Sequence, residues 1–150
     1  MEPKITVMLI MARERRLSLL ETLEVSGIYV LPVCDCSEAR RMLESQLQVQ
    51  VVLTDRALPD GDWRAVLEIV AQERANVQVV VCSRLRDHQL VIDVLEQGAY
   101  DVLIEPYQRE EIRRVLESAA ARSYIRSRSL PLAQSTNYKT KAVRAASAAC

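Results

Sequence analysis

Five short apolar runs, separated by segments with helical spacing, constrain the fold of this chain more than any other feature. The runs are rich in Val, Leu and Ile, and most are continuous rather than alternating. Continuous apolar strands are typical of a sheet that helices cover on both faces. We therefore predict strands over residues 5–11, 29–33, 49–54, 77–82 and 102–104.

Apolar residues recur at intervals of three and four positions in each segment between these runs. In the first segment we expect Leu17, Leu20 and Leu23 to face the core. The same spacing continues in the later segments. It predicts helices over residues 15–25, 37–47, 63–70, 90–95 and 112–119.

Residues that commonly end helices stand at both ends of these segments. Gly27 and Gly98 follow the first and fourth predicted helices, where a left-handed residue often closes the last turn. Ser37 and Asp87 are the expected N-caps of the second and fourth helices. The regular alternation of strands and helices predicts an α/β fold, a doubly wound parallel sheet with helices on both faces.

Charge divides the 150 residues into two parts. Residues 1–121 carry 14 basic and 20 acidic side chains, a net charge of −6, whereas residues 122–150 carry six basic side chains and no acidic one, a net charge of +6. We predict one domain over residues 1–121. We expect residues 122–150 to form a basic helical extension, which Pro131 stops, followed by a mobile tail.

Composition excludes several classes of protein. No apolar stretch approaches the roughly 18–20 residues that a membrane span requires, and the N-terminus does not resemble a signal peptide, so we expect a cytoplasmic protein. Cys34 and Cys36 form a C-x-C pair, but no second cluster of Cys or His accompanies them, and His88 is the single histidine. A zinc site is therefore not expected.

Ligands of doubly wound sheets bind at the carboxyl ends of the strands, so we looked there for reactive side chains. Asp55 follows the third run and Ser83 the fourth. Pro106 and Tyr107 follow the fifth. Three further landmarks stand near them: Leu58-Pro59 after Asp55, and Gly98-Ala99 and Asp101 before the fifth run.

In order and spacing, these landmarks resemble the response regulator receiver family over roughly residues 4–121. The resemblance implies a flavodoxin-like, five-stranded parallel sheet with strand order 2-1-3-4-5. It also implies two-component signalling without enzymatic activity of its own, in which a histidine kinase donates a phosphoryl group to Asp55 and the Ser83 hydroxyl then binds it. The peptide bond before Pro106 is expected to be cis.

The chain departs from the family pattern at three places. The family holds Mg²⁺ with two acids after the first strand, but Ile10, Met11, Ala12 and Arg13 stand there. Glu105 replaces a lysine that neutralises the phosphoryl group. The position of the aromatic switch residue is Val102, and Tyr100 lies two residues before it.

These departures predict an atypical receiver whose phosphorylation is weakened or lost and which acts by binding a protein partner, either a kinase or a downstream target. No cofactor is expected, and Mg²⁺ would bind only if the site were active, with Glu14 and Asp55 as candidate ligands. We also expect Arg13 or Arg84, at the rim of the pocket, to pair with Asp55 or Glu105.

Two other functions remain open at this stage. The chain could still accept phosphate on Asp55, using an irregular metal site that involves Glu14 and Glu105. Alternatively, the basic tail could bind nucleic acid, although no DNA-binding fold follows and nucleic acid is not the expected partner. The mixed charges of the fifth helix would also suit a homodimer through the face formed by the fourth helix, fifth strand and fifth helix.

Overall fold

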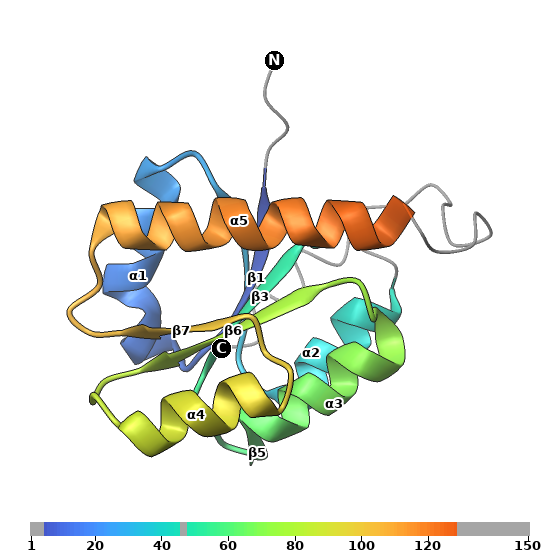
Figure 1. The fold of residues 1–150 in the computed structure, drawn as a ribbon, viewed down its shortest axis with the longest axis horizontal. Coiled ribbons are helices and arrows are strands. Elements are labelled where there is room, and N and C mark those ends of the chain that lie inside the picture. Colours follow the sequence, from blue (N-terminus) through green and yellow to red (C-terminus); the bar gives the residue numbers. More distant parts are fainter. Residues whose placement is uncertain (1–4, 46–47, 129–150) are drawn as a thin grey trace.

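The computed structural model describes residues 5–45 and 48–128, and these form a five-stranded parallel sheet flanked by helices (Figure 1). The strand order, β2-β1-β3-β6-β7, confirms the predicted doubly wound sheet. The central strands are β1 (Thr6–Ile10), β3 (Val51–Asp55) and β6 (Gln78–Ser83), and the edge strands are β2 (Tyr29–Val33) and β7 (Asp101–Ile104).

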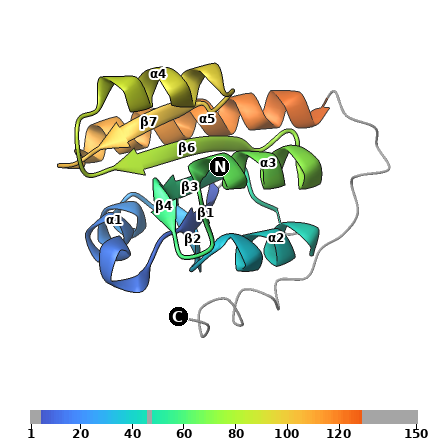
Figure 2. The ribbon, with the colours of Figure 1, turned by 90° about the horizontal axis from the view of Figure 1, so that it is seen from below.

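Five helices lie on the two sides of the sheet (Figure 2). On one face, α1 (Arg13–Val25) and α5 (Arg109–Arg128) pack against Val7, Leu9 and Leu53. On the other face lie α2 (Cys36–Glu44), α3 (Trp63–Glu73) and α4 (His88–Glu96). Among the described residues, no helix is both long and apolar enough to cross a membrane.

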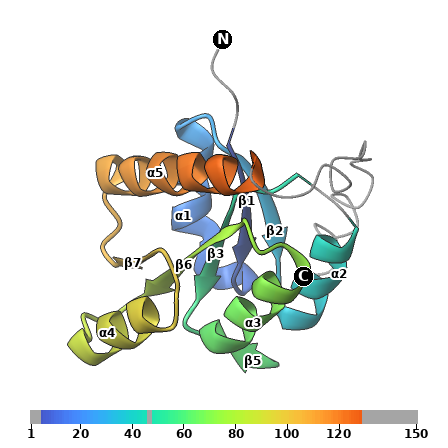
Figure 3. The same cartoon turned by 45° about the vertical axis from the view of Figure 1, so that its right-hand side comes forward.

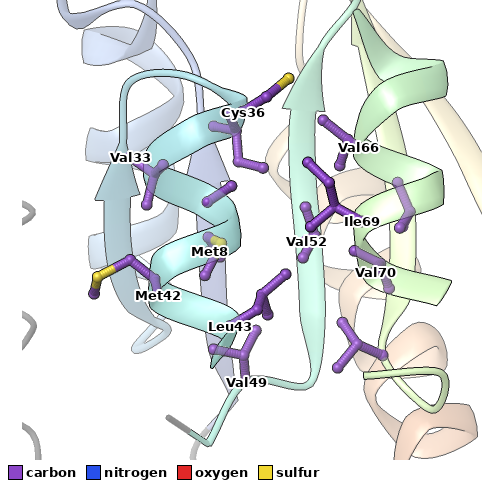
Figure 4. Packing of buried hydrophobic residues seen from close by; sticks show 14 of the residues in the cluster. Met8, Val33, Cys36, Met42, Leu43, Val49, Val52, Val66, Ile69 and Val70 are labelled. Carbon is purple, nitrogen blue, oxygen red and sulfur yellow. The ribbon is translucent and has the colours of Figure 1, made fainter. Parts of the chain in front are cut away.

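The two faces have separate cores because successive side chains of a strand point to opposite sides. Figure 4 shows side chains of α2 and α3 converging on Val52 of β3. Val51 and Leu53, the neighbours of Val52 in the same strand, belong instead to the core beneath α1 and α5. The alternation therefore also decides which helices the side chain of the last residue of each strand faces.

The buried stripe of α1 differs in part from the predicted one, since Leu23 is buried as expected and Leu20 only partly. Leu19 and Leu23 are fully buried, together with most of Arg16, whereas Leu17 is 61% exposed and does not face the core. Leucines occur on more than one side of this helix, so helical spacing alone was compatible with two stripes. The contact with the sheet selected the stripe that contains Leu19 and Leu23.

Most of the predicted helix ends are confirmed. Gly27 and Gly98 have φ angles of 78° and 101°, which L-amino acids with a Cβ rarely adopt. Asp87 caps α4 by accepting a hydrogen bond from the N–H of Leu90. Ser37, however, is not the cap of α2. That helix starts one residue earlier than Ser37, and Asp35 caps it instead, because its extended backbone directs the carboxylate to the N–H of Glu38.

The loop after β3 contains a small antiparallel hairpin that helical and strand spacing did not predict. It consists of β4 (Ala57–Leu58) and β5 (Gly61–Asp62), and it leads directly into α3 (Figure 3). The carboxylate of Asp60, at the hairpin tip, accepts hydrogen bonds from the N–H groups of Cys36 (2.8 Å) and Ser37 (3.0 Å). Asp60 thus anchors the hairpin to the first turn of α2.

The anchor makes a testable contribution to stability. Partial burial disfavours the charged carboxylate, but the hydrogen bonds from Cys36 and Ser37 outweigh it and lower the pKa of Asp60. We expect Asp60→Ala to reduce the free energy of unfolding by about 1 kcal/mol at neutral pH, as for loss of a helix cap. Because the folded-state pKa is lowered, this contribution is present above the unfolded pKa of about 4 and is lost as the pH falls through the folded value.

Urea unfolding of Asp60→Ala and of the unchanged protein, at neutral pH and at about pH 3, checks this expectation. The difference between the two proteins should shrink at the lower pH. A difference that is equally large at both pH values would contradict an ionised anchor.

At the C-terminus, α5 continues to Arg128, so residues 122–128 are helical. The predicted tail over residues 129–150 lies outside the described residues.

Candidate functional site

Asp55 is the last residue of β3, at the carboxyl edge of the sheet. Strand alternation places it on the same face as Val51 and Leu53, which is the face that α1 covers. The residue is only 7% exposed, and it pairs in the sheet with Cys82 of β6. A carboxylate in this position needs a partner, because burial of an isolated charge is costly.

Arg15 is that partner. Its Nε lies 2.7 Å from Oδ2 of Asp55, and its Nη2 donates a hydrogen bond of 3.1 Å to Oδ1. The Nε contact is an ion pair without hydrogen-bond geometry. The guanidinium nevertheless meets both carboxylate oxygens, and only a quarter of the Arg15 side chain is exposed. Such a pair is stronger than an exposed salt bridge because solvent screens it less.

The prediction that Arg13 or Arg84 pairs with Asp55 or Glu105 is confirmed by the Arg84–Glu105 pair. The partner of Asp55 is Arg15, which was not among the predicted residues. Arg13 and Glu14, two of the predicted rim residues, are exposed. Arg15 follows Arg13 by two positions, about 200° around the helix. It precedes the buried Leu19 by four positions and therefore faces the sheet. The Leu19 stripe would have pointed to Arg15 and Arg16 alike, four and three positions before Leu19. The structure distinguishes them, because Arg15 meets Asp55 and Arg16 donates a hydrogen bond to the carbonyl of Met11.

The third predicted rim residue, Arg84, pairs with Glu105 rather than with Asp55. Its Nε lies 3.7 Å from Oε2 of Glu105, and the side chains are 69% and 38% exposed, respectively. This contact is loose and exposed, so we assign it little stabilising energy. Glu105 is followed by a cis peptide bond to Pro106, the conformation expected from the sequence.

Backbone groups complete the surroundings of Asp55. The N–H of Arg56 donates a hydrogen bond of 2.8 Å to Oδ1, so this oxygen is bound by both Arg15 and Arg56. The side chain of Arg56 extends away and lies 3.2 Å from Oδ2 of Asp87, the N-cap of α4. Asp55 and the first turn of α4 are thus linked through one residue.

The Ser83 hydroxyl is engaged within its own loop. It donates a hydrogen bond of 2.8 Å to the carbonyl of Leu85 and accepts one of 3.2 Å from the N–H of the same residue. Ser83 itself is buried. In this arrangement the hydroxyl stabilises the start of the β6–α4 loop.

The two positions considered for a switch aromatic are both occupied by packed residues. Val102 belongs to the core beneath α4 with Trp63. Tyr100 packs against the opposite core, and its hydroxyl forms a hydrogen bond with Ser118 of α5. Val102 therefore provides no aromatic ring, and Tyr100 is held at α5 by its hydrogen bond with Ser118.

Cys82 and Tyr107 form the apolar floor beside Asp55. Burial, followed by the nearby charge of Asp55, raises the pKa of Cys82 to about 12. Burial and the neighbouring Cys82 and Glu105 likewise raise the pKa of Tyr107. Both groups are therefore protonated at neutral pH, and a protonated thiol is a poor nucleophile.

The donor set does not fit Mg²⁺. This ion prefers six oxygen ligands, including one or two carboxylates. Ile10 and Met11 stand where acids would be needed, and both are buried apolar residues. Arg15 covers both oxygens of Asp55. Over the described chain, no group of three His, Cys, Asp or Glu side chains could hold a metal ion.

Comparison with known proteins agrees with the observed order of the sheet. The family model of the response regulator receiver domain matches residues 13–117, more than half of the chain. The chain belongs to the response regulator receiver family. Receiver domains generally act as signalling modules rather than enzymes, and those that are active typically use Mg²⁺.

Curated receiver proteins are similar at moderate identity. The chemotaxis protein CheY of Listeria monocytogenes is 26% identical over 89 residues, which are 56% of this chain and 75% of that protein. The probable C4-dicarboxylate response regulator DctR of Bacillus subtilis is 27% identical over 93 residues, 62% of this chain and 41% of DctR. The match therefore spans about two fifths of DctR and three quarters of CheY.

Solved receiver structures share the fold. A receiver domain from Clostridium thermocellum superposes with a TM-score of 0.72 at 20% identity, over 81% of this chain and 98% of that chain. An uncharacterised protein from Neptuniibacter caesariensis reaches a TM-score of 0.76 at 27% identity, over 87% and 98% of the two chains. The flavodoxin-like architecture predicted from the sequence is thereby confirmed.

Proposed function

We propose that this receiver-family protein takes part in two-component signal transduction by binding a protein partner, without efficient phosphorylation of Asp55. The receiver unit comprises residues 1–121, and residues 122–150 are its basic extension. Asp55 is then a vestigial acceptor, and Ser83 has become a structural residue of its loop. The contact of Arg15 with both oxygens of Asp55 is the observation that carries this proposal.

Phosphoryl transfer adds negative charge that the site must stabilise. Here the donor set for a metal ion is lacking, and Glu105 brings a further negative charge in place of lysine. At ~4 Å and an effective dielectric constant of about 20, each unit of charge changes the interaction by about 4 kcal/mol, and the exposure of Glu105 reduces this figure. Arg15 also occupies the carboxylate oxygens that would have to attack phosphorus.

The face of α4 supports a role in protein binding. Ile92 and Leu95, one turn apart, are 49% and 48% exposed, which is unusual for large apolar side chains that share a helix face. We propose that a histidine kinase or a downstream target covers them. A second copy of the chain is the alternative occupant, since α5 presents the mixed charges of Glu110, Arg113 and Glu117 at its surface.

Acetyl phosphate and Mg²⁺, followed by intact mass measurement, test the loss of phosphorylation. We expect no species heavier by the mass of one phosphoryl group, because Arg15 occupies both oxygens of the Asp55 carboxylate and the donor set for Mg²⁺ is lacking. A matched incubation of Asp55→Asn distinguishes reaction at Asp55 from reaction elsewhere. A stoichiometric mass gain that requires both Mg²⁺ and Asp55 would refute the proposal and establish an ordinary phosphoacceptor.

A further inference from the structure

We propose that Arg15 is a resident cation, a permanent substitute for the metal ion, that holds the carboxyl edge of the sheet and the start of α4 in one arrangement. This inference rests on the proposed function, because it explains how the site stays ordered without metal or phosphate. It concerns regulation, since a receiver held in this way presents one surface at all times.

The first step is the geometry of the pair. The Arg15 guanidinium donates one hydrogen bond to Oδ1 of Asp55, and its Nε lies 2.7 Å from Oδ2 as an ion-pair contact. A guanidinium also stays charged throughout the physiological pH range. Arg15 lies in the first turn of α1, where the helix dipole disfavours a positive charge. The carboxylate of Asp55 offsets this cost, so each residue stabilises the other's position.

The second step is the connection from Asp55 to α4. Oδ1 of Asp55 accepts hydrogen bonds from both Arg15 and the backbone of Arg56. The Arg56 side chain is paired with Asp87, and Asp87 accepts a hydrogen bond from the N–H of Leu90. A fixed carboxylate therefore fixes the backbone of Arg56, and with it the direction in which the Arg56 side chain reaches α4.

A second contact, between α3 and α4, is mainly apolar. The guanidinium of Arg64, in the first turn of α3, lies 3.8 Å from Asp93 of α4 and 4.5 Å from the centre of the Trp63 ring. The Trp63 ring is buried against Leu90 beneath α4. The packing of Trp63 beneath α4 and the pair between Arg56 and Asp87 hold α4 at two points, so the side chains of Ile92 and Leu95 are presented in a fixed orientation. Removal of Arg15 should loosen the contact between Arg56 and Asp87 and leave the packing of Trp63 beneath α4 in place.

Amide hydrogen exchange of the full-length chain tests the inference. In Arg15→Gln, we expect exchange at the amides of Arg56 and Leu90 to rise at least about fivefold, because the carboxylate loses its fixed position. Arg113→Gln is the matched control. It removes an exposed Arg–Glu pair of 3.2 Å on α5, and it should leave both amides within about twofold of the unchanged protein.

Arg15→Lys separates charge from geometry. Lysine keeps the positive charge, but its compact ammonium cannot meet both carboxylate oxygens as the planar guanidinium does, so exchange at Arg56 should be intermediate. Unchanged exchange in Arg15→Gln would overturn the inference, and so would a rise at Arg56 without any rise at Leu90. If Arg15→Gln does not fold, exchange in Arg15→Lys equal to that of the unchanged protein would overturn it as well.

The two proposals can fail separately. Phosphorylation of the unchanged protein on Asp55 would refute the proposed function. If the protein does not accept phosphate but amide exchange is unchanged in Arg15→Gln, only the proposed role of Arg15 is refuted.

Discussion

Replacement of Trp63 by alanine is expected to destabilise the protein by about 3–5 kcal/mol. Trp63 is the first residue of α3 and is 2% exposed. Its ring fills the space between β6 and α4, where it packs against Val81, Leu90 and Val94. Alanine would leave a large cavity that backbone relaxation closes only in part, so the loss combines the transfer of the ring to water with the cavity term.

Urea unfolding followed by circular dichroism measures this loss, since the variant no longer contains the single tryptophan of the chain. Arg64→Ala is the control. It removes the cation that lies 4.5 Å from the ring and the exposed pairs with Asp62 and Asp93, so we expect a loss of no more than about 1 kcal/mol. Equal losses in the two variants would show that the ring is not an essential part of the α4 core.

The second large effect concerns α1. Leu19→Ala is expected to cost about 2–5 kcal/mol, whereas Leu17→Ala should change the free energy of unfolding by no more than about 0.5 kcal/mol. Leu19 is fully buried between α1 and the sheet, whereas Leu17 faces solvent and is 61% exposed. The substitutions are chemically identical and two positions apart in one helix, so helix propensity affects both equally.

Thermal or urea unfolding of the two leucine variants decides which stripe of α1 faces the sheet. The answer bears on the site, because Arg15 lies four positions before Leu19 and shares its side of the helix. A larger loss of stability in Leu17→Ala would show that α1 presents the Leu17 side to the sheet. Arg15 would then face away from Asp55, and the pair between them would have no basis.

The site joins two features that are separately ordinary. Arginine–carboxylate pairs are common in proteins, and acidic residues commonly end the third strand in receivers. Here they coincide, so that the residue which would accept phosphate is bound by a cation of the same chain. The expected consequence is a signalling module whose binding face does not depend on metal or phosphate.

The fold could be predicted from the sequence because it depends on local patterns. Continuous apolar runs indicated strands covered on both faces, and their alternation with helical segments implied the parallel sheet. Gly27 and Asp87 marked helix ends through conformations and hydrogen bonds that involve only neighbouring residues. The replacement of lysine by Glu105 and the apolar residues at positions 10 and 11 were also visible in the sequence.

Only the tertiary structure decided the contacts between residues that are far apart in the chain. Arg15 and Asp55 are 40 positions apart, and Asp60 reaches α2 across 24 positions. The rotation of α1 determined which arginine faced the carboxylate. That rotation depends on how leucines pack against the sheet, because several helix faces carried enough apolar residues to be buried. Local spacing limits such choices, and packing between distant elements selects among them.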